Sequence, residues 1–372
     1  MDIKFNKASI FNAHILSGTT IINLFRLLAD NKFAISLRFI PRLLLVLPII
    51  LLNIPFVILE RLLYDQKIKN TIVKQPVFIL GYPRSGTTFL MYLLSKDPRF
   101  AFCKTYECMG PGVIFTFGPV LRKIAKLVLP AKRPMDNLEL GADVPKEEEF
   151  ALGGMGIGSM ANALYFPKNF GNYFNRFVLF NGIPAEKKTY KKNHEWLLKK
   201  LTLKNNNKQL LLKSPFNTGR IKVILEMYPD AKFIHIHRHP YSVFLSNEKL
   251  YESILPQVAL QTVGNLEMKE HVINTYRDSY KSFFNDKTLL KKEQLFEMSY
   301  KEFIANPAET LKNVYAQLNL EGFETALPYI IKEAEHYAGY KVNKHAADNE
   351  KLEMVYSKWK DIYNLLGYKK EL

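Results

Sequence analysis

The stretch Pro76-Val-Phe-Ile-Leu-Gly-Tyr-Pro-Arg-Ser-Gly-Thr-Thr88 decides how this chain of 372 residues folds. Its apolar run from Val77 to Leu80 predicts a short buried strand. A loop bounded by Gly81 and Gly86 follows, and residues 87–94 have the pattern of a helix. A strand, a glycine-bounded loop and a helix together direct backbone N–H groups and a helix N-terminus at an anion. The segment therefore predicts a phosphate-binding loop.

The loop differs from the one that binds Mg-ATP. That P-loop has a lysine after its second glycine, where Thr87 stands here, and the cation lies inside the loop as Arg84. An ATPase or kinase would also end a strand in an aspartate that holds Mg²⁺. The second candidate strand here ends in His237 and Arg238 instead. A kinase or ATPase is therefore disfavoured, and an anionic donor without a metal is favoured.

A second strand-to-helix junction lies further along the chain. Residues 231–237 form a strand-like run, and Pro240 suits the first turn of the helix that follows. Arg238 precedes that helix, and Ser246 lies about two turns along it. Both junctions fall at the carboxyl ends of predicted parallel strands, where α/β proteins bind their ligands.

With these two motifs the chain resembles the sulfotransferase superfamily that uses 3′-phosphoadenosine 5′-phosphosulfate (PAPS). The resemblance runs from about Pro76 to the C-terminus. It implies that the 3′-phosphate is held by Arg238 and Ser246, and that the 5′-phosphosulfate is bound by Arg84, Ser85, Gly86, Thr87 and Thr88. It also implies nucleotide contacts from Tyr300 and from a lysine near the C-terminus, Lys341 or Lys344. We expect no metal ion in this site.

Sulfuryl transfer needs positive charge at the leaving oxygen and a base that takes the proton of the acceptor. In the cytosolic branch of the superfamily this base is the histidine of a Lys-Thr-His motif. The matching segment here has Lys213, but Pro215 stands at the histidine position. The resemblance to tyrosylprotein sulfotransferases and bacterial relatives implies a glutamate after the first helix instead. Glu107 is therefore the expected base, with Lys213 and Arg84 as cations near the transferring group.

An acidic segment at residues 143–150 is the alternative source of the base. Glu147, Glu148 or Glu149 could face the acceptor, although these carboxylates would also complement the dipole of a helix that starts there. The alternative role of Glu107 is an ordinary ion pair with a nearby basic residue.

The order of the predicted elements indicates an α/β fold. Short strands at 77–80, 209–213, 232–237 and 293–298 alternate with helical stretches. This order predicts a P-loop-like parallel sheet flanked by helices on both faces. We expect a sulfotransferase domain at 76–372, in which residues 100–205 form a mostly helical insertion that shapes the acceptor pocket. Residues 1–75 are expected to be an apolar helical segment, either membrane-associating or packed on the domain.

Residues 43–59 form a run of seventeen residues without a charge. This length is at the lower limit for a transmembrane helix, and Pro48, Asn53 and Pro55 interrupt the run. Basic residues flank it on both sides, at Arg38, Arg42, Arg61, Lys67 and Lys69. The symmetric flanks favour a segment that dips into or lies on one leaflet. A helical hairpin packed on the catalytic domain is the alternative.

The formal net charge of +17 fits either a polyanionic donor or an anionic membrane surface. Nucleic acid is not an expected partner, because the basic residues are scattered and no nucleic-acid-binding module is visible. The two cysteines, Cys103 and Cys108, are too few for a disulfide framework or a structural zinc site. They suit a reducing compartment. A disulfide bond across the short loop between them is the alternative.

These observations predict a PAPS-dependent sulfotransferase at the cytoplasmic face of a membrane. The apolar segment and the aromatic-rich insertion favour the hydroxyl group of a lipid or sterol-like molecule as the acceptor. A carbohydrate hydroxyl and a protein tyrosine are the alternative acceptors. A membrane-associated nucleotide-binding protein without enzymatic activity is the alternative from another class.

Overall fold

The computed structural model describes residues 14–133, 135–136, 138–337 and 348–371. The chain divides into two compact units. The sheet unit comprises Lys74–Phe102, Lys208–Glu248 and Val272–Leu372. The helical unit comprises Met1–Val73, Cys103–Asn207 and Lys249–His271. Each unit is therefore assembled from segments that are far apart in the sequence.

The sheet unit is built on a parallel sheet of five strands. Their spatial order is β2 (Phe100–Ala101), β3 (Gln209–Lys213), β1 (Val77–Leu80), β4 (Lys232–His237) and β5 (Leu295–Ser299). The predicted parallel α/β sheet is confirmed, and the bounds of β1, β3 and β4 match the prediction. β5 begins at Leu295 rather than at residue 293. The two-residue edge strand β2 was not predicted, because it is too short to leave a hydrophobic period.

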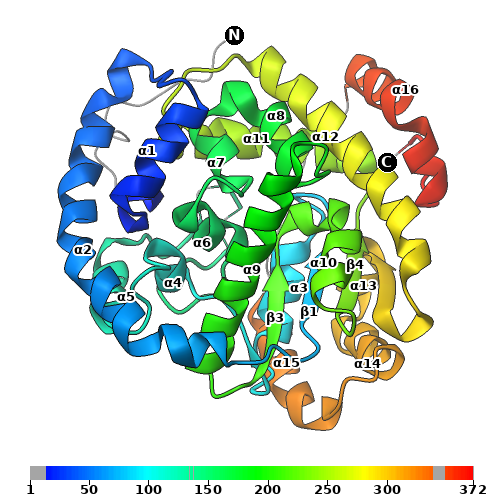
Figure 1. Cartoon of the computed structure of the whole chain (residues 1–372). Helices are drawn as coiled ribbons and strands as arrows, with labels where there is room; N and C mark the ends of the chain where they lie inside the picture. The colour runs from blue at the N-terminus through cyan, green and yellow to red at the C-terminus, as the bar shows by residue number, and fades with distance from the viewer. Residues whose placement is uncertain (1–13, 134, 137, 338–347, 372) are drawn as a thin grey trace. The chain divides into compact units, whose positions relative to one another are not determined.

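Helices flank this sheet (Figure 1). In the sheet unit they are α3 (Thr87–Leu94), α10 (Ile221–Met227), α13 (Tyr300–Ala305), α14 (Pro307–Gln317), α15 (Phe323–His336) and α16 (Asn349–Leu365). α11 (Pro240–Val258) and α12 (Asn265–Asp286) have residues in both units. Every residue of β1 is buried, because Val77 and Ile79 pack in a core with Leu90 of α3 while Phe78 stacks on Phe233 of β4. Such double burial explains the continuous apolar run of this strand.

The helical unit contains the long helix α2 (Ile40–Lys69), which appears in blue beside α1 in Figure 1. α2 continues without a break through Pro48 and Pro55 and extends beyond both ends of the predicted apolar run. The other helices wholly within this unit are α1 (Ile21–Asp30), α4 (Thr105–Met109), α5 (Gly118–Val128), α6 (Glu148–Met155), α7 (Ala161–Tyr165), α8 (Phe170–Phe177) and α9 (Pro184–Lys204). This unit carries the candidate base and, among the described residues, the one helix that is long and apolar enough to cross a bilayer.

Candidate active site

The loop between β1 and α3 has a backbone that favours glycine. Gly81 and Gly86 have φ values of +141° and +103°, and Arg84 also lies at a positive φ of 76°. The N–H of Gly81 donates to Thr218 Oγ1 at 2.8 Å, and the N–H of Ser85 donates to Tyr82 O at 3.1 Å. Gly86 is the N-cap residue of α3 and has no side chain that could cap the helix. The loop thus turns the start of α3 into the kind of helix N-terminus that binds anions.

Close packing also requires a glycine at position 86. A Cβ atom built on Gly86 would lie 2.4 Å from the ring of Tyr300. The guanidinium of Arg238 lies over the same ring, 5.3 Å from its centroid. The residue expected to touch the nucleotide, Tyr300, therefore lies between the phosphate loop and the arginine at the end of β4.

The predicted donor-site residues converge at the carboxyl ends of β1, β3 and β4. Arg84 Nε donates to Ser246 Oγ at 2.9 Å, which joins the loop to α11. Lys213, the last residue of β3, places its Nζ 3.4 Å from Thr88 Oγ1. Residues far apart in the sequence are thus brought together, and three of them carry a positive charge.

The environment of these residues is largely buried. Ser85, Thr87, Lys213 and Ser246 are all buried in the sheet unit. Burial raises the pKa of the Tyr300 phenol, and the Arg238 and Arg84 cations oppose that rise. Cations in such a low-dielectric site interact with an anionic ligand far more strongly than they would in water.

His237 does not add to this positive charge at neutral pH. Burial lowers its pKa to about 4, and its Nδ1 lies 2.9 Å from the hydroxyl of Tyr368. The charge of the site at pH 7 therefore comes from the arginines and Lys213.

Two residues that support the loop were not predicted from the sequence. Thr218 accepts the hydrogen bond from Gly81, and Asn247 Nδ2 donates to Pro83 O at 2.9 Å. Neither residue belongs to a sequence motif, and both contacts depend on the fold. The predicted lysines near the C-terminus, Lys341 and Lys344, lie outside the described residues.

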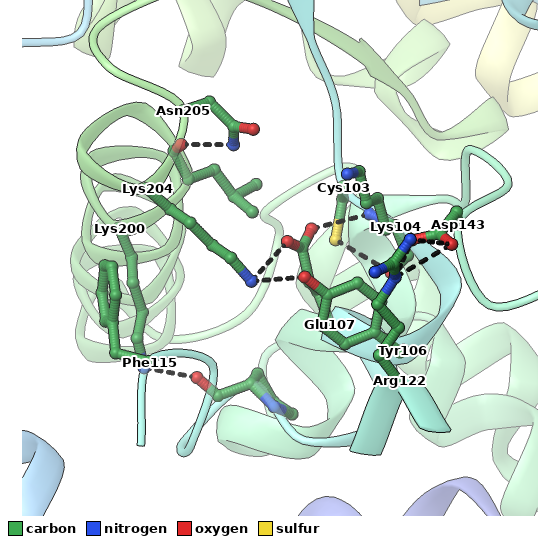
Figure 2. Close-up of polar contacts among 12 residues, drawn as sticks. Cys103, Lys104, Tyr106, Glu107, Phe115, Arg122, Asp143, Lys200, Lys204 and Asn205 are labelled. Carbon is green, nitrogen blue, oxygen red and sulfur yellow. Dashed lines mark hydrogen bonds and ion pairs between the residues drawn. The ribbon is translucent and has the colours of Figure 1, made fainter. Parts of the chain in front are cut away.

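The helical unit holds the expected base, Glu107, in a set of polar contacts drawn in Figure 2. Its Oε1 pairs with Lys204 Nζ at 2.9 Å, and its Oε2 accepts the N–H of Lys104 at 2.8 Å. Lys204 Nζ also donates to the hydroxyl of Tyr106 at 2.5 Å. Only 1% of Glu107 is exposed. The side chain thus stabilises the start of α4, and its Lys204 partner comes from the end of α9.

The acidic segment lies in the same part of the helical unit. Glu149 is buried, and its Oε1 accepts hydrogen bonds from Ser159 Oγ at 2.9 Å and Met160 N at 2.7 Å. Glu148 is also buried at the start of α6. The hydrogen bond with Cys108 and burial raise the pKa of the Cys103 thiol, and the charges of Glu107 and Glu148 raise it further. Glu107 and Glu148 thus belong to two helices, α4 and α6, that pack against each other.

Both cysteines are free thiols, with their Sγ atoms 3.3 Å apart. Among the described residues, no group of three or more His, Cys, Asp and Glu side chains is arranged to hold a metal ion.

The fold and the phosphate loop agree with a family assignment. The sequence model that defines the sulfotransferase family matches residues 76–325 of this chain. The chain belongs to this sulfotransferase family. The predicted class of enzyme is thereby confirmed.

Mycobacterial sulfotransferases are among the proteins similar to this chain. The omega-hydroxy-beta-dihydromenaquinone-9 sulfotransferase Stf3 of Mycobacterium bovis is 29% identical over 310 residues, which cover 83% of this chain and 79% of the relative. The protein of the same name from Mycobacterium tuberculosis gives the same values. Among solved structures, sulfotransferase STF1 from Mycobacterium tuberculosis has a TM-score of 0.65 at 16% identity, covering 91% of each chain. STF9 from Mycobacterium avium has a TM-score of 0.62 at 19% identity, covering 84% of this chain and 82% of that one.

Proposed function

We propose that this sulfotransferase moves a sulfuryl group from PAPS to the hydroxyl group of a lipid at the cytoplasmic face of a membrane. The observation that carries the donor assignment is the convergence of Arg84, Lys213 and Arg238 on one glycine-bounded loop. These three cations match a ligand that has a phosphosulfate and a separate phosphate group.

The residues present fit this donor. Glycine at positions 81 and 86 lets the loop pack closely on the rest of the sheet unit, because a Cβ would lie 2.3 Å from Ile236 O in the first case and 2.4 Å from the Tyr300 ring in the second. When bound, PAPS supplies the sulfuryl group. Arg84, Ser85, Gly86, Thr87 and Thr88 would hold the phosphosulfate, and Arg238 and Ser246 the 3′-phosphate. Tyr300 would contact the nucleotide, and Lys344 stays a further proposed contact.

The chemistry asks two things of the chain, which are stabilisation of the leaving oxygen and acceptance of the proton. Arg84 and Lys213 would stabilise negative charge that develops on the oxygen between phosphorus and sulfur. The acceptor oxygen forms a bond to sulfur while the sulfur–oxygen bond to phosphate breaks. The proton of the acceptor hydroxyl passes to a base. Each of these roles is assigned to a side chain already present, without a metal ion.

Glu107 is the proposed base. An ionised carboxylate has about four lone-pair positions, and the contacts with Lys204, Lys104 and Tyr106 account for three of them. Acceptor capacity is therefore left on the carboxylate. A carboxylate of the acidic segment, Glu147, Glu148 or Glu149, is the alternative base.

The acceptor assignment is supported by similarity and by hydrophobicity. The relative Stf3 is named for a dihydromenaquinone acceptor, which is a lipid. One helix among the described residues, Leu37–Lys69, is long and apolar enough to cross a bilayer, and only 22% of its most apolar stretch is buried. We propose residues 1–75 as the membrane-associating segment, residues 76–372 as the sulfotransferase domain and residues 100–205 as the insertion that shapes the acceptor pocket.

The direct test uses sulfur-radiolabelled PAPS and a lipid extract of the host cell. Label that partitions into the organic phase would support a lipid acceptor and provide a product for mass spectrometry. Label found only in the aqueous phase would move the acceptor to a carbohydrate or a protein. Binding of 3′-phosphoadenosine 5′-phosphate (PAP) without any transfer would contradict the proposed reaction and favour a nucleotide-binding protein.

A further inference from the structure

The long helix α2 has its polarity reversed relative to an ordinary surface helix. Its buried stripe contains Arg42, Asn53 and Glu60, together with Val46, Ile50 and Ile68. Between residues 44 and 63, every exposed residue except Arg61 is a leucine, an isoleucine or a proline. A helix at a water-facing surface normally places its polar residues outside. The outward face of α2 is therefore suited to a non-aqueous neighbour.

The inward polar residues hold α2 to the rest of the helical unit. Arg42 donates from Nη1 to Ala259 O at 2.6 Å and from Nη2 to Pro256 O at 2.9 Å. Asn53 Nδ2 donates to Ser17 O at 3.2 Å. These hydrogen bonds satisfy polar groups that would be costly to leave unpaired in hydrocarbon.

Glu60 completes this attachment near the C-terminal part of α2. Its Oε2 accepts from the N–H groups of Phe115 and Thr116 at 2.8 and 2.9 Å, and its Oε1 forms an ion pair with buried Lys200. A transmembrane orientation of α2 would require these partners to separate and would carry charged side chains into the bilayer. The contacts therefore favour a helix that stays docked along its length.

Two further elements of the helical unit expose apolar side chains. α1 and the turn after it expose Ile22, Phe25 and Phe33, and the rings of Phe25 and Phe33 lie 5.6 Å apart. α5 exposes Val120, Ile124 and Leu127, which share one face at spacings of four and three residues. Phe117, the N-cap residue of α5, packs on Phe56 of α2 with ring centroids 4.6 Å apart. The start of α5 thus packs directly against α2.

The same region is positively charged. Exposed cations lie on or beside these helices at Arg26, Arg38, Arg61, Lys67, Lys69 and Lys123. No acidic residue is exposed between residues 14 and 73, since Asp30 and Asp65 are partly buried and Glu60 is buried. Apolar residues bordered by cations are typical of proteins that insert into the headgroup region of an anionic membrane. Two copies of such a surface would instead repel each other.

We propose that the outward faces of α1, α2 and α5 form one membrane-docking face that lies in the plane of a single leaflet containing anionic lipid. The docking face is represented by Ile22, Phe25, Leu52, Leu62, Ile124 and Leu127. α2 lies along the membrane and does not span it. This inference deepens the proposed function, because a lipid acceptor would occupy the same leaflet.

Vesicle flotation tests the docking face with purified full-length protein. The vesicles contain phosphatidylcholine alone or phosphatidylcholine with phosphatidylglycerol. Wild-type protein should float with the anionic vesicles, and the double change Leu52→Glu and Leu62→Glu should lower the partition coefficient by about tenfold or more. Leu266→Glu is the matched control, since Leu62 and Leu266 are both 79% exposed. Equal flotation of all three proteins would overturn the docking face.

Depth-dependent quenching tests whether α2 lies in the plane. Single cysteines at positions 45, 52 and 59 carry an environment-sensitive fluorophore, on a background with Cys103→Ala and Cys108→Ala. An in-plane helix gives the same shallow depth at all three positions. A spanning helix gives its greatest depth at position 52 and would overturn the proposal. The wild-type protein is also examined by light scattering, where a dimer that buries the face in the absence of lipid would overturn it too.

The outcome separates docking from catalysis. Transfer to a detergent-solubilised lipid extract should be unchanged by Leu52→Glu and Leu62→Glu, whereas transfer to the same lipids in vesicles should fall with flotation. If the wild-type protein floats with anionic vesicles but transfers sulfuryl groups neither to the detergent-solubilised lipids nor to the vesicles, the result counts against the proposed reaction and not against the docking face. If the wild-type protein transfers sulfuryl groups to lipid but does not float with the vesicles, the result counts against the docking face and not against the proposed reaction.

Discussion

Buried Glu107 and partly buried Lys204 form an ion pair, with 2.9 Å between Oε1 and Nζ. The two residues come from α4 and α9, and the lysine also binds the hydroxyl of Tyr106. Removing one member of a buried pair leaves an unpaired charge or an unsatisfied polar group, so its cost includes more than the lost contact. The catalytic and structural roles of Glu107 must therefore be separated by experiment.

Glu107→Gln tests the proposed base. The variant should lower the rate of sulfuryl transfer by about 10² to 10⁴-fold, because it removes proton acceptance, while the affinity for PAP stays unchanged. Lys204→Met keeps the carboxylate and should retain transfer with an altered pH profile. Retained transfer in Glu107→Gln, with loss in Glu148→Gln, would assign the base to Glu148 instead. Thermal unfolding of each variant shows whether a loss of activity reflects a loss of fold.

Arg238→Ala tests the assignment of the 3′-phosphate site. A charge-assisted hydrogen bond contributes about 1.5–3 kcal/mol, so the affinity for PAP should fall by about ten- to a hundredfold. The affinity for adenosine 5′-phosphosulfate, which lacks that phosphate, should change little. Isothermal titration calorimetry with both ligands measures the two effects. Equal losses for the two ligands would remove Arg238 from the 3′-phosphate site.

Gly86→Ala tests the close packing of the donor loop. The added Cβ would lie 2.4 Å from the Tyr300 ring at a φ of +103°, so PAP affinity should fall by more than about tenfold. Gly367→Ala is the control for backbone strain alone, because Gly367 has a φ of +73° and no heavy atom within 4 Å of its added Cβ. It should cost about 1 kcal/mol of stability and leave PAP affinity intact. Full PAP affinity in Gly86→Ala would show that the ring moves aside freely.

Glu60→Gln tests how α2 is held to the helical unit. Lys200 would keep its buried position without a carboxylate partner, and burial already lowers the pKa of its ammonium. Breaking a buried pair from one side costs about 3–5 kcal/mol in the free energy of unfolding. Combining Glu60→Gln with Lys200→Met should recover much of that loss, as measured by denaturant titration. A double variant that is less stable than the single one would contradict this account.

His14 makes the stability of the chain sensitive to acid. Burial lowers its pKa from 6.5 to about 4, and the neutral ring fits its contacts, with Nδ1 accepting from Leu16 N at 3.2 Å and Nε2 lying 2.8 Å from Val258 O. As the pH falls from 6.5 to about 4, the unfolded chain binds the proton first, so the free energy of unfolding decreases. The loss is about 3 kcal/mol at most.

His14→Gln should therefore flatten the decrease in unfolding free energy over that pH window. Denaturant titrations at several pH values between 7.5 and 4.5 measure the slope. His336→Gln, at an exposed position, serves as the matched control and should keep the wild-type slope. Identical slopes for wild type and His14→Gln would rule out His14 as the source.

Local sequence was enough to predict the sheet and the donor loop. β1, α3 and β4 are continuous segments whose apolar runs, glycines and prolines determine their conformation without distant partners. The order of strands and helices then restricts the sheet to a parallel one, with the motifs at its carboxyl edge. β2 was not predicted, because a strand of two residues is too short to show a periodic pattern of apolar residues.

The tertiary structure alone decided which side chains meet. Glu107 and Lys204, Glu60 and Lys200, and Gly81 and Thr218 are separated by long stretches of chain, and nothing in the local pattern pairs them. It also decided which face of α2 is buried, because composition cannot reveal that Arg42 and Glu60 point inward while leucines point outward. Short-range preferences depend on neighbouring residues in the chain, whereas burial and ion pairing depend on contacts that form only when distant segments pack.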